Sequence, residues 1–236
     1  MRGRRCTQLM SEFAWQSIIA RAGSLELPKR RTIVVVPHPD DETLLTGGLI
    51  ARQTGGGVPV VIVAVTDGEA AYPSWPAPGL GRLRCTEQDK ALHMLDVPGG
   101  STVRLRLPDG KVSNHERELG RVLADLIDPG DMIVAPWEFD WHPDHEACGR
   151  AAKWATSGRN VTLISSLFWA YHRVDPVKHP DLDIRRLDLT EAEMNRRLNA
   201  LDAHRSQLQS HRHEAILSPD LFEHLSRDAE HFVVTS

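Results

Sequence analysis

The chain has 236 residues, a formal net charge of −4 at pH 7 with neutral histidines, and 3 cysteines. This length is enough for one α/β domain with a sizeable core, and the charge gives no reason to expect binding to nucleic acid or to an anionic membrane surface. An odd number of scattered cysteines is typical of a reducing, cytoplasmic environment rather than of a disulfide framework.

Residues 1–30 precede the first predicted strand. Their basic start suggests a signal peptide, but Gln8, Glu12 and Gln16 interrupt the segment that would have to be apolar. We therefore expect an amphipathic helical extension that lies on the domain or on the partner subunit of a homo-oligomer. No stretch of the sequence approaches the ~20 apolar residues that a membrane span needs.

The first predicted strand, residues 32–36, is continuously apolar, as is typical of a buried parallel strand. It runs into a polar turn, residues 38–42, with the sequence HPDDE, and a helical pattern follows over residues 41–53. The acidic cluster therefore lies at the carboxyl edge of the predicted sheet, where ligands bind in open α/β folds.

Three uses of this polar turn compete. Helix capping explains one carboxylate, but not a histidine and three carboxylates together. A phosphate site needs glycine-rich backbone and positive charge, so the acids argue against it. In a metal site, His38 and Asp41 can converge on one cation while Asp40 stays free to act as a base. This last interpretation needs another ligand elsewhere in the chain.

The second predicted strand, residues 58–65, leads into an irregular loop over residues 66–81 that is rich in glycine, proline and aromatic residues. Such a loop at the carboxyl end of a strand is expected to form the mouth of a site. Trp75 lies in this loop, and we expect it to form an apolar rim together with Trp137 or Trp141. The alternative for Trp137 and Trp141 is packing in the core.

A helix is predicted over residues 81–97, and Arg84 lies near its start, beside the expected mouth. Two interpretations of Arg84 are open. It can form a surface ion pair with Glu87, one helical turn along, or it can point at the substrate and hold a polar or anionic group.

A second polar turn follows the strand predicted over residues 131–135. It carries the sequence HPDH over residues 142–145, where another helix begins. Two histidines near a helix start are often surface residues. However, two such turns at the same edge of one parallel sheet face each other across a cleft, so His145 can complete the ligand set.

The rest of the chain continues the alternation of strands and helices. Further strands are predicted over residues 103–107, 161–170, 182–189 and 232–234, and further helices over residues 114–127 and 191–207. Thr190 and Glu193 form a capping-box pattern at the start of the last helix. Near its end, one interpretation of His204 is an exposed histidine that the helix dipole favours, and whether His204 contacts substrate is open.

The two polar turns resemble those of the PIG-L/LmbE-like family of metal-dependent N-deacetylases. The resemblance covers roughly residues 31–210 and extends to Val65–Glu69, Arg84 with Glu87, Leu107–Gly110 and Ala203–Gln207. It implies a Rossmann-like three-layer α/β sandwich with a mainly parallel sheet and the active site at the carboxyl ends of the strands. One deacetylase domain would then span residues 31–236, after the extension over residues 1–30.

The family resemblance also implies a function. The expected enzyme is a hydrolase that removes an acetyl or short acyl group from an N-acylated small molecule, such as an N-acetylglucosaminide or a related glycoconjugate. Zn²⁺ is the implied cofactor, held by His38, Asp41 and His145 with water in an open position, and Fe²⁺ is a possible substitute. Asp40 is the implied general base.

The remaining site residues are expected to assist the hydrolysis, orient the metal ligands or bind the substrate. His142, protonated or held by Asp144, is implied to assist the oxyanion or to protonate the departing amine. Glu42 and Asp144 are expected to orient the ligands through hydrogen bonds. Arg84 and Trp75 are the expected substrate-binding residues.

Asp140 departs from the pattern of the family. Some relatives that act on small thiol-related glucosaminides have a tyrosine two residues before the first histidine of the second motif, where this chain has Asp140. This departure leaves open whether their substrate and oxyanion donor apply to this chain, so a glucosaminide substrate is an inference from the family resemblance alone. Two other functions stay open: an amidase for a larger acyl or conjugate amide, and a non-catalytic metal-binding module, which the presence of Asp40 disfavours.

Overall fold

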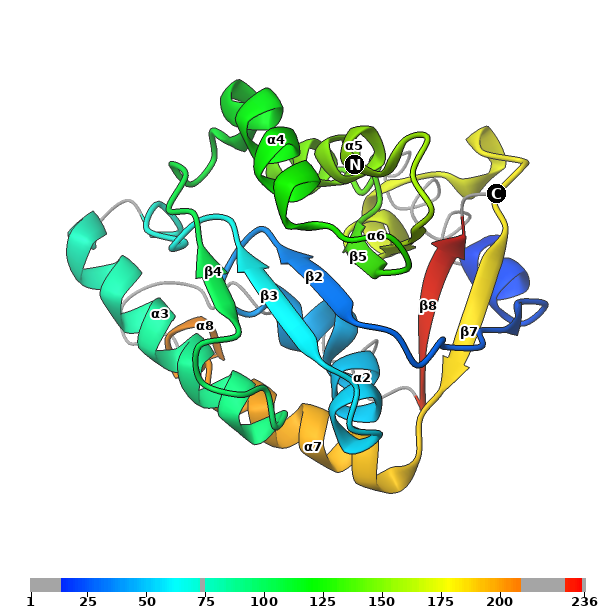
Figure 1. Cartoon of the computed structure of the whole chain (residues 1–236), viewed down its shortest axis with the longest axis horizontal. Coiled ribbons are helices and arrows are strands. Elements are labelled where there is room, and N and C mark those ends of the chain that lie inside the picture. Colours follow the sequence, from blue (N-terminus) through cyan, green and yellow to red (C-terminus); the bar gives the residue numbers. More distant parts are fainter. Residues whose placement is uncertain (1–13, 73–74, 209–227, 235–236) are drawn as a thin grey trace, which may run out of the picture.

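The computed structural model describes residues 14–72, 75–208 and 228–234. Their centre is an 8-stranded sheet with the strand order β1-β7-β8-β6-β5-β2-β3-β4 (Figure 1). The strands are β1 (Gly23–Ser24), β2 (Thr32–Val36), β3 (Val60–Ala64), β4 (Thr102–Arg104), β5 (Met132–Pro136), β6 (Thr162–Ser166), β7 (Ile184–Asp188) and β8 (Ala229–Val234). Only β8 runs antiparallel to its neighbours, β6 and β7, so the predicted mainly parallel sheet is confirmed.

The helices cover both faces of this sheet (Figure 1), which confirms the predicted three-layer arrangement. One face carries α2 (Asp41–Gly55), α3 (Ala77–Met94), α7 (Glu191–Leu201) and α8 (Arg205–Leu208), and the other carries α4 (Glu116–Leu126) and α5 (Pro143–Thr156). Shorter helices are η1 (Val112–His115), α6 (Ala170–Arg173) and η2 (Pro176–Lys178). No helix in the described part of the chain has the length and apolarity that crossing a bilayer requires.

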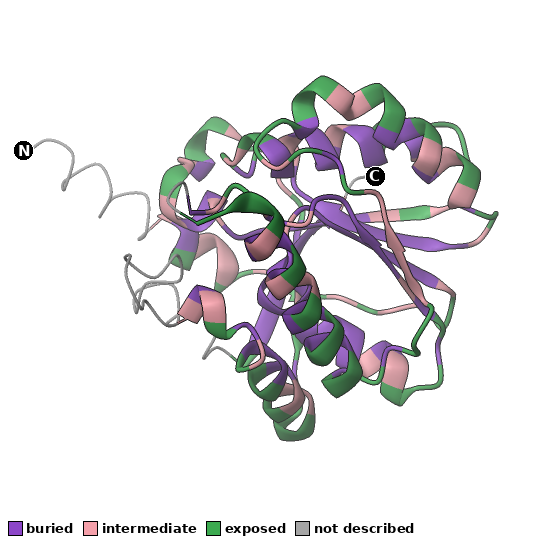
Figure 2. Cartoon of the chain, turned by 90° about the vertical axis from the view of Figure 1, so that its left-hand side faces the viewer, coloured by how far each residue is buried: buried purple, intermediate pink, exposed green. Residues whose placement is uncertain are grey.

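Strand β2 is buried along its whole length because both of its faces are covered. Val34 and Val36 belong to the core under α2, α3 and α7, while Ile33 and Val35 belong to the core under α4 and α5. Figure 2 shows the buried sheet inside and the exposed residues on the outer sides of the helices. This double burial explains why the strand is continuously apolar.

The order of the strands brings the two polar turns together. Strand β2 pairs in parallel with β3 and also with β5. The chain passes from β2 to β3 and β4 on one side, and then returns to β5 on the other side. Residues 38–42 follow β2 and residues 142–145 follow β5, so both turns lie at the switch point where open α/β sheets bind ligands.

The N-terminal segment contributes to the domain. Residues 14–19 are helical, and Trp15, only 2% exposed, packs against Tyr171 with ring centroids 5.3 Å apart. Strand β1 then pairs in parallel with β7 at the edge of the sheet. The remainder of the predicted helical extension, residues 1–13, lies outside the described residues.

The prediction of a strand over residues 161–170 is wrong at its end. Strand β6 ends at Ser166, and α6 begins at Ala170. The carboxylate of Asp140 accepts hydrogen bonds from the backbone N–H groups of Phe168 and Ala170. These bonds turn the chain out of the sheet.

The prediction of one helix over residues 191–207 is also wrong in part. Helix α7 ends at Leu201 and α8 begins at Arg205, although the predicted capping box of Thr190 and Glu193 is present. The break at residues 202–204 directs His204 inward, and its side chain is fully buried. The expectation of an exposed histidine is therefore wrong, because a buried ion pair outweighs the attraction of the helix dipole.

The structure predicts that Gly149 cannot accept a side chain. A Cβ atom there would lie 2.5 Å from the carbonyl oxygen of Pro136 and 2.7 Å from the backbone nitrogen of Glu138. Because backbone atoms cannot move aside easily, Gly149→Ala should destabilise the protein by at least the ~1–3 kcal/mol of an overpacked core. Urea unfolding measures this change.

Gly99→Ala is the matched control, because a Cβ atom at Gly99 would meet nothing within 4 Å. Its free energy of unfolding should stay within about 0.5 kcal/mol of the parent. If both variants unfolded at the same urea concentration, the close contact between α5 and the end of β5 would be wrong.

Candidate active site

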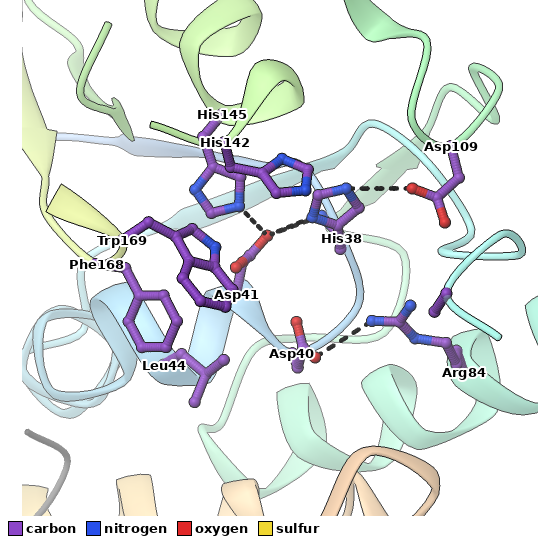
Figure 3. A pocket seen from close by; sticks show the side chains of 11 residues that line it. His38, Asp40, Asp41, Leu44, Arg84, Asp109, His142, His145, Phe168 and Trp169 are labelled. Carbon is purple, nitrogen blue, oxygen red and sulfur yellow. Dashed lines mark hydrogen bonds and ion pairs between the residues drawn. The ribbon is translucent and has the colours of Figure 1, made fainter. Parts of the chain in front are cut away.

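Asp41 lies between two imidazoles that come from the two polar turns. Its Oδ2 atom is 3.1 Å from Nδ1 of His38 and 3.3 Å from Nε2 of His145. Figure 3 shows both rings pointing at this carboxylate. Burial alone would raise the pKa of Asp41, but the neighbouring His145 and His38 hold that pKa well below its usual value.

His145 is oriented from behind by Asp140. Its Nδ1 atom lies 2.9 Å from Oδ2 of Asp140, and both side chains are fully buried. Because a carboxylate only accepts, His145 donates from Nδ1 and directs Nε2 at Asp41. Burial lowers the pKa of His145, but Asp41 and Asp140 raise it to about 9. Asp140 thus contacts the imidazole and the backbone of residues 168 and 170, rather than the cavity.

His38 is also oriented by carboxylates, which bind the ring nitrogen that faces away from Asp41. Its Nε2 atom lies 3.1 Å from Oδ2 of Asp144 and 3.2 Å from Oδ1 of Asp109. Asp144 is itself fixed by the backbone N–H groups of Gly110 and Val112, at 2.8 and 3.1 Å. Although burial opposes it, these carboxylates raise the pKa of His38 well above its usual value.

His142 caps the start of α5 and lies over the other two histidines. Its ring centroid is 4.9 Å from that of His38 and 5.0 Å from that of His145. Burial, together with the charges of His145 and His38, lowers the pKa of His142 to about 4. In the absence of a bound cation this lowered pKa favours a neutral His142, and its protonation during the reaction stays a prediction.

The Asp144 side chain makes no hydrogen bond to His142, so the expectation that Asp144 holds His142 stays a prediction, and the hydrogen bond between them comes from the backbone. The N–H group of Asp144 donates to Nδ1 of His142 at 3.3 Å, while the Asp144 carboxylate binds His38. A neutral His142 that accepts at Nδ1 carries its proton on Nε2. It can therefore donate a hydrogen bond into the cavity that it lines.

Asp40 lies beside the histidine cluster and is bound to neither His38 nor His145. Its side chain is buried, and Oδ2 is 3.2 Å from Nη2 of Arg84. Burial raises the pKa of Asp40 to about 6, against the opposing charge of Arg84. Its backbone has φ 127°, a region that residues other than glycine rarely adopt.

Arg84 is buried in the wall of the cavity. Besides Asp40, it binds the carbonyl oxygens of Gly68 and Pro39, each at 2.8 Å. The alternative of a surface ion pair with Glu87 is therefore wrong, because Glu87 binds Ser206 instead. A contact between Arg84 and substrate stays a prediction.

Glu42 supports the same turn from inside the protein. It accepts hydrogen bonds from the backbone N–H of Asp40 at 3.2 Å and from Nε2 of Gln88 at 2.9 Å. Its other oxygen lies 2.8 Å from Nε2 of His204. Burial opposes ionisation, but His204 and these hydrogen bonds keep the pKa of Glu42 below its usual value.

These groups surround a cavity of about 230 Å³ with a polar floor and an apolar wall (Figure 3). It is lined by His38, Asp40, Asp41, Leu44, Ala71, Arg84, Asp109, His142, His145, Phe168 and Trp169. The aromatic residues of this wall were missed from the sequence. Phe168 and Trp169 follow β6, the neighbour of β5, and that position at the sheet edge is the signal that could have found them.

The three tryptophans of the predicted rim lie in different surroundings. Trp137 is buried and packs in the core, whereas Trp141 is 50% exposed, with its ring centroid 6.3 Å from that of Trp169. Trp75 is 39% exposed and is not among the residues that line the cavity. Its contact with substrate stays a prediction.

Two groups of side chains among the described residues offer donor atoms within 4.8 Å of one another: His38 with His142 and His145, and His38 with Asp109 and Asp144. The predicted ligands His38, Asp41 and His145 share two imidazoles with the first group. Nitrogen and carboxylate donors of this kind suit first-row transition metals, so the residues present fit a cation site.

The comparison with known proteins is consistent with this geometry. The 1D-myo-inositol 2-acetamido-2-deoxy-alpha-D-glucopyranoside deacetylase of Nocardia farcinica is 42% identical in an alignment 140 residues long that covers 48% of this chain and 47% of that protein. The match thus spans about half of that relative. The "Probable N-acetyl-alpha-D-glucosaminyl L-malate deacetylase 2" of Bacillus subtilis is 27% identical over 192 residues, covering 76% of this chain and 84% of that protein.

A solved structure supports the fold. The N,N'-diacetylchitobiose deacetylase from Pyrococcus horikoshii superposes with a TM-score of 0.65 at 22% identity, over 87% of this chain and 83% of that chain. The family described as PIG-L, GlcNAc-PI de-N-acetylase, matches residues 33–156, which are more than half of the chain and contain both polar turns. This protein therefore belongs to the PIG-L family.

Proposed function

We propose that this protein is a metal-dependent N-deacetylase that hydrolyses the amide bond of an N-acetylated, GlcNAc-type sugar or glycoconjugate. The observation that carries the proposal is the convergence of His38, Asp41 and His145 beside the Asp40 carboxylate in one cavity. The names of relatives from Nocardia farcinica and Bacillus subtilis, both deacetylases of acetylated glucosamine derivatives, support this substrate class.

His38, Asp41 and His145 would hold the cation. Nε2 of His145 supports this assignment: it is buried, it has no hydrogen-bond partner among the described residues, and it faces Asp41. Two imidazoles and a carboxylate are typical of catalytic Zn²⁺ sites; Fe²⁺ suits the same donors in a reducing cell. When bound, such a cation lowers the pKa of a water molecule and polarises the amide carbonyl.

Asp41 is preferred over His142 as the third ligand. Oδ2 of Asp41 is within 3.3 Å of a nitrogen of each imidazole. His142, by contrast, already accepts a backbone hydrogen bond at Nδ1, so its remaining ring nitrogen carries a proton when the ring is neutral. We assign this proton to a hydrogen bond with the substrate, whereas the protons that lie between Asp41 and the imidazoles of His38 and His145 would be lost when a cation binds.

Asp40 would accept the proton of the attacking water. Arg84 binds one oxygen of the Asp40 carboxylate, which fixes its direction and leaves the other oxygen to take the proton. A positioned carboxylate of this kind is an effective general base. His142 would donate a hydrogen bond from Nε2 to the carbonyl oxygen of the substrate, where negative charge develops as water attacks.

The apolar wall would receive the acyl methyl group and one face of the sugar ring. Leu44, Phe168 and Trp169 form this wall. The cavity of about 230 Å³ has room for an acetyl or short acyl group, and the alternative amidase for a larger acyl chain stays open. Asp40, held beside the proposed ligands, disfavours a module that only binds metal.

We also propose that the protein is located in the cytoplasm. Cys85 and Cys148 are free thiols, as expected in a reducing cytoplasm. The substrate would be a small molecule, and a homo-oligomer stays a prediction.

The ligand assignment predicts loss of metal. His145→Ala, His38→Ala and Asp41→Ala should each lower zinc content well below one ion per chain, because each change removes one bond to the cation. Elemental analysis after dialysis measures the content. His115→Ala, which removes a surface histidine paired with Glu118, should bind zinc like the parent. Near-stoichiometric zinc in His145→Ala would exclude His145 as a ligand.

The base assignment predicts loss of rate without loss of metal. Asp40→Asn keeps the size of the side chain, and asparagine tolerates unusual backbone angles. This variant should retain zinc while kcat for acetate release falls by roughly two to four orders of magnitude. If the variant loses zinc instead, Asp40 is a ligand and the roles of the paired aspartates are wrong.

The proposed contact between substrate and the apolar wall predicts a change in KM when an aromatic residue of this wall is removed. Trp169→Ala should raise KM for an N-acetylglucosaminide by about 2- to 13-fold, the loss expected for an aromatic contact worth about 0.5–1.5 kcal/mol. Trp75→Ala should act in the same direction if Trp75 belongs to the rim, with zinc content and Tm nearly unchanged. Trp154→Ala, which alters an exposed tryptophan on α5, is the control. Equal KM values in all three variants would contradict the aromatic wall.

A further inference from the structure

A buried histidine outside the cavity contacts the turn that carries the proposed base. His204 lies in the break between α7 and α8 and is not among the residues that line the cavity. Its Nε2 atom is 2.8 Å from Oε1 of Glu42, and both side chains are fully buried. The two residues are 162 positions apart in the chain, so a distant segment reaches the first polar turn.

Glu42 connects His204 to Asp40, because its second carboxylate oxygen binds the backbone of Asp40. Its Oε2 atom accepts the backbone N–H of Asp40 and the side-chain amide of Gln88. One carboxylate therefore joins three parts of the chain: the polar turn after β2, helix α3, and the segment after α7. Because the carboxylate is buried, its orientation is set by these partners rather than by water.

Asp40 needs such support because its backbone is strained. Its φ of 127° and ψ of −31° lie where residues with a Cβ atom are disfavoured. Such a conformation persists only when the surrounding structure determines it. The backbone N–H groups of Thr43 and Leu44 hold its carbonyl oxygen, both at 2.9 Å, and Arg84 holds its carboxylate. Glu42 holds the remaining backbone group, the N–H.

The segment that carries His204 is anchored independently. Ser206 donates to Glu87 of α3 from its backbone N–H at 2.9 Å and from its hydroxyl at 2.6 Å. The hydroxyl of Tyr72 donates to the carbonyl oxygen of Ser206 at 3.0 Å. A change confined to the His204 imidazole should therefore leave this segment in place.

We propose that His204 is a positioning residue for the reaction: acting through Glu42, it holds Asp40 in the strained conformation that aims its carboxylate into the cavity. This inference rests on the proposed function, in which Asp40 takes a proton from water. The competing explanation is that the pair of His204 and Glu42 only stabilises the fold. The two explanations predict different effects of replacing His204 on kcat and on hydrogen exchange at the Asp40 N–H.

The first test compares His204→Leu with His204→Gln. Leucine fills the space without a donor, whereas the glutamine amide can donate to Glu42. His204→Leu should lower kcat by about 10- to 100-fold, the usual effect of losing a group that orients a site residue, with KM and zinc content unchanged. His204→Gln should recover most of the rate. An unchanged kcat with a lowered Tm in His204→Leu would overturn the proposal.

Glu230→Gln is the matched control for damage to the same helix. Glu230 is buried and accepts the backbone N–H groups of Gly48 and Leu49 in α2, but it does not contact Asp40. This variant should lose stability while kcat stays near that of the parent. If kcat falls as far as in His204→Leu, the effect is general damage to α2 and the proposal is wrong.

A double-mutant cycle tests whether the effect passes through Asp40. In the Asp40→Asn background, adding His204→Leu should cause no further loss of kcat, because the group that His204 positions is already gone. Losses that multiply would overturn the proposal. If His204→Leu does not fold, Gln88→Leu takes its place, because Gln88 donates to the same carboxylate, and the same outcome is expected.

Amide hydrogen exchange provides a readout that does not depend on activity. In His204→Leu, the Asp40 amide should exchange faster than in the parent, while amides in β2 exchange as before. If the parent protein releases no acetate from any N-acetylated sugar, the proposed function fails, and this measurement still decides whether His204 holds the turn. Unchanged exchange at Asp40 would overturn the inference.

Discussion

The carboxylate of Asp41, placed between the imidazoles of His38 and His145, is the contact on which the site depends. It joins two turns that are far apart in sequence and that meet only because β2 and β5 are neighbours in a parallel sheet. Any change in the order of these strands would separate the imidazoles. The central sheet, buried on both faces, therefore fixes the geometry of the site as well as the stability of the domain.

Burying this many acids requires positive charge nearby, because an unpaired buried carboxylate is costly. The protein supplies it in pairs: Asp140 faces His145, Asp144 faces His38, and Arg84 faces Asp40. These contacts also set directions. Each imidazole is held from behind by a carboxylate, an arrangement that orients histidine ligands and increases their basicity in metal sites. Charge compensation and the positioning of ligands are thus achieved by the same bonds.

The sequence predicts the features that depend on local patterns. Continuous apolar runs predict the strands, and two polar turns at one sheet edge predict that His38 and His145 meet. What it misses depends on contacts between distant segments. Asp140 ends β6 early by binding the backbone of residues 168 and 170, and the ion pair with Glu42 turns His204 inward. Neither contact leaves a periodic signal, so helix and strand patterns are overextended at both places.

The proposed mechanism requires that His38, Asp41 and His145 hold one cation while Asp40 stays free to accept a proton. Anomalous diffraction from crystals grown with Zn²⁺, recorded on both sides of the zinc absorption edge, tests it most directly. We expect one strong peak in contact with these three side chains and out of contact with Asp40. A peak bound by Asp40, or by His38 together with Asp109 and Asp144, would contradict it.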